Sequence, residues 1–150
     1  MIAVIQRVSE AKVEVEGKTV GACGKGFLIL LGVAEGDTER DGILLAEKIR
    51  KMRIFEDENG KMNRALADVD GELLVISQFT LLANYAHGNR PDFLNAAKPA
   101  VAEPLYDGFC EYIRTYVPKT EKGIFGADMK VSLVNDGPVT IVMDSKVLIK

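Results

Sequence analysis

The sequence predicts an α+β fold: a mainly antiparallel, barrel-like β-sheet with two principal helices packed on one side. Three observations carry this prediction. Apolar runs of strand length dominate the first third of the chain, and two later segments repeat apolar residues at helical spacing. No linker, repeat or low-complexity tract divides the 150 residues. The length suits one hydrophobic core, so we expect a single domain over residues 1–150.

Strand-like segments come first. Met1–Val8 and Ala11–Glu16 are predicted as two strands, and Thr19–Cys23 as a third after a turn at Glu16–Lys18. Valine and glutamate alternate over residues 13–16, which indicates that one face of this strand is exposed to solvent, as in an antiparallel sheet. Phe27–Leu31 is bracketed by glycines and is predicted as a buried strand.

Helical signals follow. Asp37 and Thr38 are N-cap candidates for a helix that extends to about Met52. A second long helix is predicted from about Glu103 to Tyr116, with Pro104 in its first turn, the position where proline is tolerated. A short helix is expected to carry Phe93 and Leu94.

Turn residues divide the remaining strands. Glu58–Lys61 and Asp70–Gly71 are predicted as hairpin turns, the second leading into a strand over Leu73–Thr80. Asn84–Asp92 is predicted as a polar loop. A closing hairpin is expected over Met129–Val142.

Composition limits the function classes. The longest apolar runs fall short of the roughly 20 residues of a membrane span, and the N-terminus lacks the pattern of a signal peptide. Cys23 and Cys110 are far apart, as expected of reduced thiols in a cytoplasmic protein. A net charge of −3 argues against broad contact with a nucleic-acid backbone, although it permits binding of a small terminal piece.

Two short segments carry the chemical information. Ser77-Gln78-Phe79-Thr80 places hydroxyls and an amide at the end of an apolar run, where turn residues usually stand. Gly137-Pro138 lies between two strand-like segments and requires a turn of fixed backbone shape. From the residues alone, backbone capping and a plain β-turn are slightly favoured over an oxyanion hole and a cis peptide.

Other catalytic arrangements are less well supported. His87 is the single histidine, lies in a polar loop, and would have to fold over Ser77 or Thr80 to activate either hydroxyl. One histidine and two isolated cysteines do not form a zinc site, and the acidic run Glu56–Glu58 lacks the spacing of a calcium loop. We expect no metal and no cofactor.

Together the two segments resemble the SQxT and NxGP motifs of the D-aminoacyl-tRNA deacylases, and the resemblance extends over the whole chain. It implies hydrolysis of the ester that joins a D-amino acid, or glycine, to the 3′-terminal adenosine of tRNA. Ser77, Gln78, Phe79 and Thr80 would form the catalytic segment, with backbone N–H groups near Phe79 and Thr80 as the oxyanion hole and Thr80 as a positioning residue.

The resemblance also implies the remaining site residues and the assembly. Gly137 and Pro138 would form a cis peptide that enters the active site of a second subunit and excludes L-amino acids, so a homodimer is expected. Gly123–Met129 resembles the family segment that lines the adenosine pocket, with Phe125 and Met129 as adenine contacts. Core packing would explain these last two residues equally well.

Two other functions stay open at this point. One is a non-catalytic, oligomeric module that binds an RNA end or a nucleotide on the same scaffold. The other is a general esterase, although the chain lacks the G-x-S-x-G nucleophile elbow and a base beside Ser77.

Overall fold

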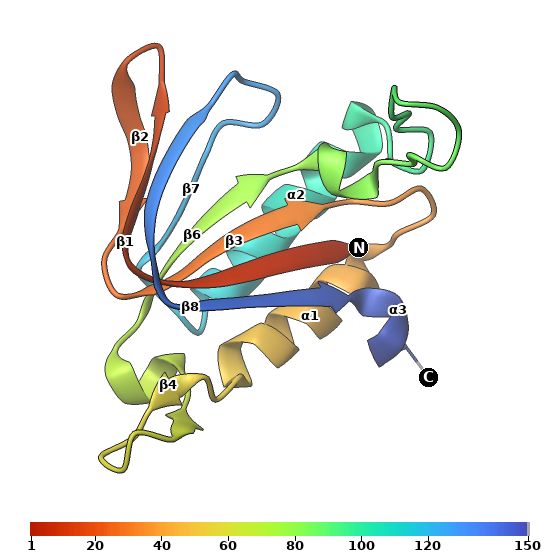
Figure 1. The fold of residues 1–150 in the computed structure, drawn as a ribbon. Coiled ribbons are helices and arrows are strands. Elements are labelled where there is room, and N and C mark those ends of the chain that lie inside the picture. The colour runs from red at the N-terminus through yellow and green to blue at the C-terminus, as the bar shows by residue number, and fades with distance from the viewer. Residues whose placement is uncertain (150) are drawn as a thin grey trace.

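One long strand, β1 (Ile2–Val15), organises the fold (Figure 1). The computed structural model describes residues 1–149. Strand β8 (Lys130–Asp144) runs antiparallel along one edge of β1, and β3 (Gly26–Gly32) and β2 (Lys18–Cys23) follow each other along the other edge. The prediction of two strands over residues 1–16 is therefore wrong. Ser9 and Glu10 are exposed at a register shift, but pairing with β8 continues on both sides of it.

Two further strands extend the sheet in parallel. Strand β6 (Glu72–Ser77) pairs with β3, and β7 (Thr120–Lys122) pairs with β6. Strand β7, the far edge of the sheet, then approaches β2: the N–H of Ala22 on β2 donates a 3.0 Å hydrogen bond to the carboxylate of Glu121 on β7. This side-chain contact nearly closes the sheet. The predicted α+β class with a barrel-like sheet is confirmed.

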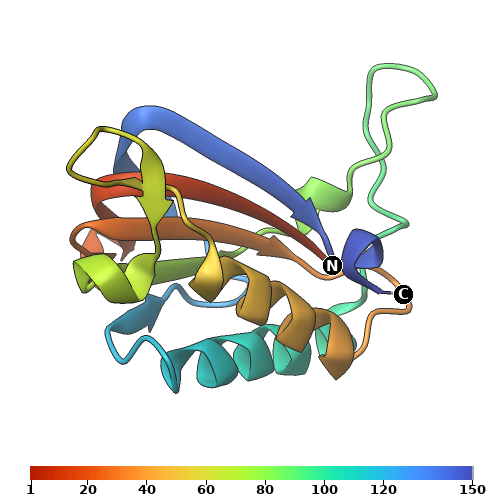
Figure 2. The same cartoon turned by 90° about the horizontal axis from the view of Figure 1, so that it is seen from below.

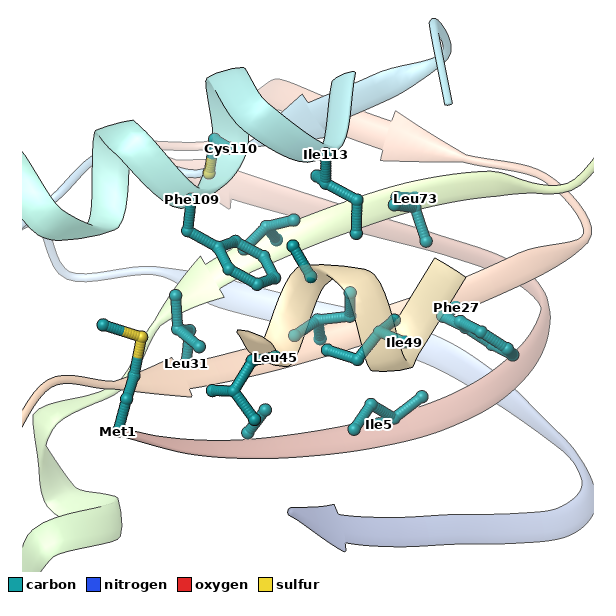
Figure 3. Packing of buried hydrophobic residues seen from close by; sticks show 14 of the residues in the cluster. Met1, Ile5, Phe27, Leu31, Leu45, Ile49, Leu73, Phe109, Cys110 and Ile113 are labelled. Atoms are coloured by element: carbon teal, nitrogen blue, oxygen red, sulfur yellow. The ribbon is translucent and has the colours of Figure 1, made fainter. Parts of the chain in front are cut away.

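Both long helices cover the same face of the sheet (Figure 2). They are α1 (Glu39–Lys51) and α2 (Pro99–Arg114). Leu45 and Ile49 of α1 and Phe109 and Ile113 of α2 are buried against the strands, as Figure 3 shows. No helix within residues 1–149 is long and apolar enough to span a membrane.

Helix α1 begins where the sequence predicts. Thr38 is its N-cap, and the Thr38 N–H donates a 2.9 Å bond to the carboxylate of Asp41. Helix α2 begins four residues earlier than predicted, because Pro99 supplies a fixed φ suited to a first helical position. Pro104 consequently lies inside the helix and not in its first turn. Ala100, whose carbonyl loses a partner there, is exposed to water.

Three connections also differ from prediction. Asp70 does not form a hairpin turn: at φ +51° it caps a 3₁₀ turn, η1 (Leu66–Val69), which links separate sheets. Phe93 and Leu94 are not helical, since their segment is held by backbone bridges, Asp92 to Asn84 and Ala96 to Ala34. The predicted hairpin at 58–61 is confirmed by the pairing of two short strands, β4 (Phe55–Glu56) and β5 (Met62–Arg64).

Candidate functional site

A cavity of about 540 Å³ opens where the parallel strands β3 and β6 end, beside the start of α2. Most of its wall is apolar, with Leu31, Ile76, Ala102 and Tyr106 among the lining residues. This volume lies in the range of small-molecule sites in proteins. The cavity is therefore large enough for a nucleoside.

The Ser77–Thr80 segment forms one wall of this cavity. Ser77 ends β6, and the N–H of Gln78 donates a 2.9 Å bond to the carbonyl of Leu31 on β3. The chain then turns into a 3₁₀ helix, η2 (Phe79–Leu82), so the predicted strand ends at Ser77 and not at Thr80. The close approach of this turn requires Gly32, where a Cβ would lie 2.9 Å from the carbonyl oxygen of Gln78.

Two backbone donors are free at this turn. No hydrogen bond within residues 1–149 uses the N–H of Phe79 or of Thr80, because both stand at the start of η2. The amide of Gln78 hydrogen-bonds the hydroxyl of Thr80, and the ring of Phe79 packs edge-on against Phe93 at 5.0 Å. Free N–H groups beside a cavity can stabilise a developing oxyanion.

Phe125 and Met129 also line the cavity and are half-buried. The segment that carries them is tied to β6 at Val75, whose carbonyl accepts bonds from the Gly123 N–H (3.1 Å) and from the Tyr106 hydroxyl (2.8 Å). Burial raises the pKa of Tyr106, so its hydroxyl stays protonated as a donor. The Tyr106 ring lies 6.0 Å from that of Phe125.

Gly137 and Pro138 do not form the predicted closing hairpin. Strand β8 is continuous, and β1 pairs with both its halves: Gln6 with Thr140 and Val8 with Asn135. The four residues 136–139 therefore stand opposite a single residue of β1 as a bulge. The peptide bond between Gly137 and Pro138 is cis.

This bulge is held from within by Arg7, the residue of β1 that it faces. The buried Arg7 guanidinium donates 3.0 Å and 2.7 Å bonds to the carbonyls of Asp136 and Ile54. The side chain of Asn135 closes the base of the bulge by accepting a 3.0 Å bond from the Val139 N–H. These contacts fix an exposed backbone segment against a buried support.

Five of the eight residues that the sequence analysis names as site residues line the cavity: Ser77, Gln78, Phe79, Phe125 and Met129. Thr80 adjoins it through Gln78. Gly137 and Pro138 do not line the cavity of their own chain and are exposed.

The remaining chemical candidates lie elsewhere. His87 is exposed and is not among the lining residues. Burial raises the pKa of Cys23 to about 12 and that of Cys110 to about 11, so both thiols are unreactive near neutral pH. Within residues 1–149 no three histidine, cysteine or acidic side chains are grouped as metal ligands would be.

Sequence reasoning missed several residues of the site. Arg7 stands in an apolar strand at a core-facing position, and that unusual placement was the available signal. Lys98 and Ala102 were missed because α2 was expected to begin after them, and Tyr106 because a tyrosine inside a predicted helix carries no signal of a cavity.

Comparison with known proteins agrees with this geometry. A family model described as D-Tyr-tRNA(Tyr) deacylase matches residues 4–144. The chain belongs to this family. A relative from Geobacter sulfurreducens, named D-aminoacyl-tRNA deacylase, is 59% identical over 97% of this chain and 96% of its own. A relative of the same name from Sulfurihydrogenibium is also 59% identical, over 99% of this chain and 100% of its own.

Two solved structures share the architecture of this deacylase family member. One, named c-Myc DNA Unwinding Element Binding Protein, has a TM-score of 0.90 at 41% identity and covers 96% of this chain and 98% of its own. The other, described as a probable eukaryotic D-amino acid tRNA deacylase, has a TM-score of 0.80 at 15% identity, with 95% and 97% covered. The second likeness shows the fold alone.

Proposed function

We propose that the protein hydrolyses the ester bond of D-aminoacyl-tRNA and releases the free amino acid and the tRNA. The observation that carries this proposal is the cavity of nucleoside size, with the free backbone N–H of Phe79 at its wall and that of Thr80 on the next residue. Family membership and the names of the relatives support the same reaction. Because aminoacyl-tRNA is made and used where translation occurs, the protein is expected in the cytoplasm.

In this proposal the terminal adenosine occupies the cavity with its base against Phe125 and Met129. The ester then lies beside Ser77 and Gln78, which orient it. Attack of water gives a tetrahedral intermediate whose oxyanion accepts bonds from the N–H groups of Phe79 and Thr80. Collapse of the intermediate breaks the bond between the acyl carbon and the 3′ oxygen of the ribose, and that oxygen takes up the proton that the attacking water gave up.

Chirality would be read by a second subunit. The exposed bulge at Gly137 and Pro138, supported by the buried Arg7, suits insertion into a neighbour better than action in its own chain. In a homodimer, carbonyls from this bulge would face the α-amino group and leave no room for an L side chain. A D side chain would point to solvent, and glycine would also be accepted.

The substrate itself would supply the proton acceptor. Thr80 lies beside the Gln78 amide, which is not a base, and His87 does not line the cavity. The vicinal 2′-hydroxyl of the terminal ribose adjoins the ester and can orient and activate water. The protein then selects the substrate, orients its ester and stabilises the oxyanion.

One assay tests this function. Release of amino acid is measured from D-tyrosyl-tRNA, L-tyrosyl-tRNA and a simple aryl ester at equal concentrations. We expect hydrolysis of the D substrate alone. Equal hydrolysis of all three substrates would identify a general esterase instead.

Non-catalytic nucleic-acid binding is the second candidate, and it is favoured by the name of one solved relative, a DNA unwinding element binding protein. The net charge of −3 argues against wide contact with a duplex. Binding of the tRNA end with no release of amino acid would support this candidate over hydrolysis.

A further inference from the structure

One positive charge in the wall of the cavity has no acidic partner. Lys98 lines the cavity immediately before α2, and its side chain is exposed. The salt bridges and hydrogen bonds of residues 1–149 do not include its ammonium group, and the first turn of α2 contains no acidic residue. The other charged lining residue, Asp128, lies 3.2 Å from the ammonium of Lys130, in an exposed ion pair.

Lys98 has no evident structural task. It occupies the N-cap position of α2 without a capping hydrogen bond, where serine, threonine, asparagine or aspartate would stabilise the helix. The ammonium is therefore available to a ligand that enters the cavity.

We infer that Lys98 binds the phosphate on the 5′ side of the terminal adenosine of the RNA. This inference rests on the proposed function and assigns a further substrate contact within the same site. The terminal nucleotide carries one negative charge, which lies on the phosphodiester that joins its 5′ oxygen to the rest of the RNA. Lysine binds phosphate as a point charge, and Lys98 is the one unpaired cation among the described lining residues.

If Lys98 binds this phosphate, the protein should prefer a small ester substrate that carries a 5′ phosphate over one that does not. One substrate is 3′-O-(D-tyrosyl)adenosine, and the other is the same ester carrying a 5′-(methyl phosphate), which adds a single negative charge. We expect the wild-type KM to be roughly fivefold lower for the phosphorylated ester, the scale of one exposed charge pair. Lys98→Ala abolishes this preference, Lys98→Glu reverses it, and Lys98→Arg retains it.

Lys61→Ala is the matched control. Lys61 is an exposed lysine of the β4–β5 hairpin, outside the cavity, and its loss changes the net charge equally. This variant keeps the phosphate preference. On full-length D-tyrosyl-tRNA, Lys98→Ala makes the plot of log(kcat/KM) against log salt shallower by about one, as the loss of one phosphate contact requires.

A phosphate preference that persists in Lys98→Ala overturns the inference. An equal loss on both esters also overturns it, because Lys98 would then support the cavity and not the phosphate. Calorimetric affinities for adenosine and for adenosine 5′-(methyl phosphate) test the contact without hydrolysis. If neither D-tyrosyl-tRNA nor either ester is cleaved, the proposed function fails, and the binding comparison still decides the role of Lys98.

Discussion

The guanidinium of Arg7 donates a 3.0 Å hydrogen bond to the backbone carbonyl of Asp136, which joins a buried side chain of β1 to the exposed bulge of β8. A second bond, to the carbonyl of Ile54, orients the same guanidinium. The position of Gly137 thus depends on a residue that does not touch the cavity of its own chain.

Arg7→Lys should loosen this support, since an ammonium lacks the planar fork that serves two carbonyls at once. We expect a loss of about 1–3 kcal/mol in the free energy of unfolding. We also expect a lower ratio of D- to L-tyrosyl-tRNA hydrolysis. Denaturant unfolding and the two kcat/KM values measure these effects, and Arg40→Lys, on an exposed arginine of α1, is the control. An unchanged ratio in a destabilised variant would limit Arg7 to a structural role.

Gly137→Ala should damage the reaction far more than Thr80→Ala. A Cβ at position 137 would lie 2.7 Å from Val139 Cγ2, and the φ of +138° disfavours any L side chain. Loss of the Thr80 hydroxyl leaves the backbone donors intact, so the rate should fall by less than roughly a hundredfold, the lower limit for loss of a general base. Gly60→Ala, also at positive φ but in open space, controls for backbone strain. An acyl-threonine intermediate in wild-type enzyme would refute this assignment.

Mixed dimers should restore activity that each parent lacks. Gly137→Ala distorts the bulge, and Ala127→Trp fills the cavity that Ala127 lines. An equal mixture, unfolded and refolded together, should recover about a quarter of wild-type activity, because half of the dimers hold one intact site of two. Light scattering checks that dimers form. Failure to recover activity in verified mixed dimers, or an active wild-type monomer, contradicts a shared site.

A D-aminoacyl-tRNA ending in 2′-deoxyadenosine, with the amino acid on the 3′ oxygen, should bind but react slowly. We expect its single-turnover rate to fall by about a hundredfold or more, since the proton acceptor is missing. Competition against the normal substrate measures its binding. Unchanged turnover would mean that the protein supplies the base, and Asp128 in the cavity wall would then be tested first, followed by Asp136 and His87.

Asp41 should make the free energy of unfolding fall more steeply with pH in the acid range. Burial disfavours its charge, but bonds from the Ser145 hydroxyl, the Thr38 N–H and the Lys146 ammonium outweigh burial and hold its pKa well below the ordinary 3.8. Its contribution is therefore complete above about pH 4 and is lost as the pH falls toward the folded-state pKa. Asp41→Asn should lower stability at pH 7 and flatten the curve below pH 4. Glu103→Gln, on an exposed carboxylate, should leave the shape of that curve unaltered.

Local patterns predicted most of the helices and strands. Helix α1 carries apolar residues at helical spacing after a capping threonine, and both signals lie within the segment itself. The start of α2 was missed because Pro99–Ala102 is too short to show an apolar stripe, although Ala102 packs into the core.

The bulge of β8 shows why part of the site was beyond local prediction. A Gly-Pro pair between two strand-like segments ordinarily indicates a hairpin. Here a distant strand, β1, pairs with both segments, and only the register between Gln6 and Val8 reveals the difference. The same long-range pairing places Arg7 beneath the bulge, and no short motif records that contact.

The pairing of β1 with β8 also has a consequence during synthesis. Ile2 pairs with Asp144, so β1 lacks one of its two neighbours until the much later strand β8 has been synthesised. Strand pairs that are far apart in the sequence form slowly, and a strand edge that is still unpaired can pair with another chain and cause aggregation. The exposed Ser9, Glu10 and Lys12 on β1 are polar groups suited to discourage such mispairing until β8 arrives.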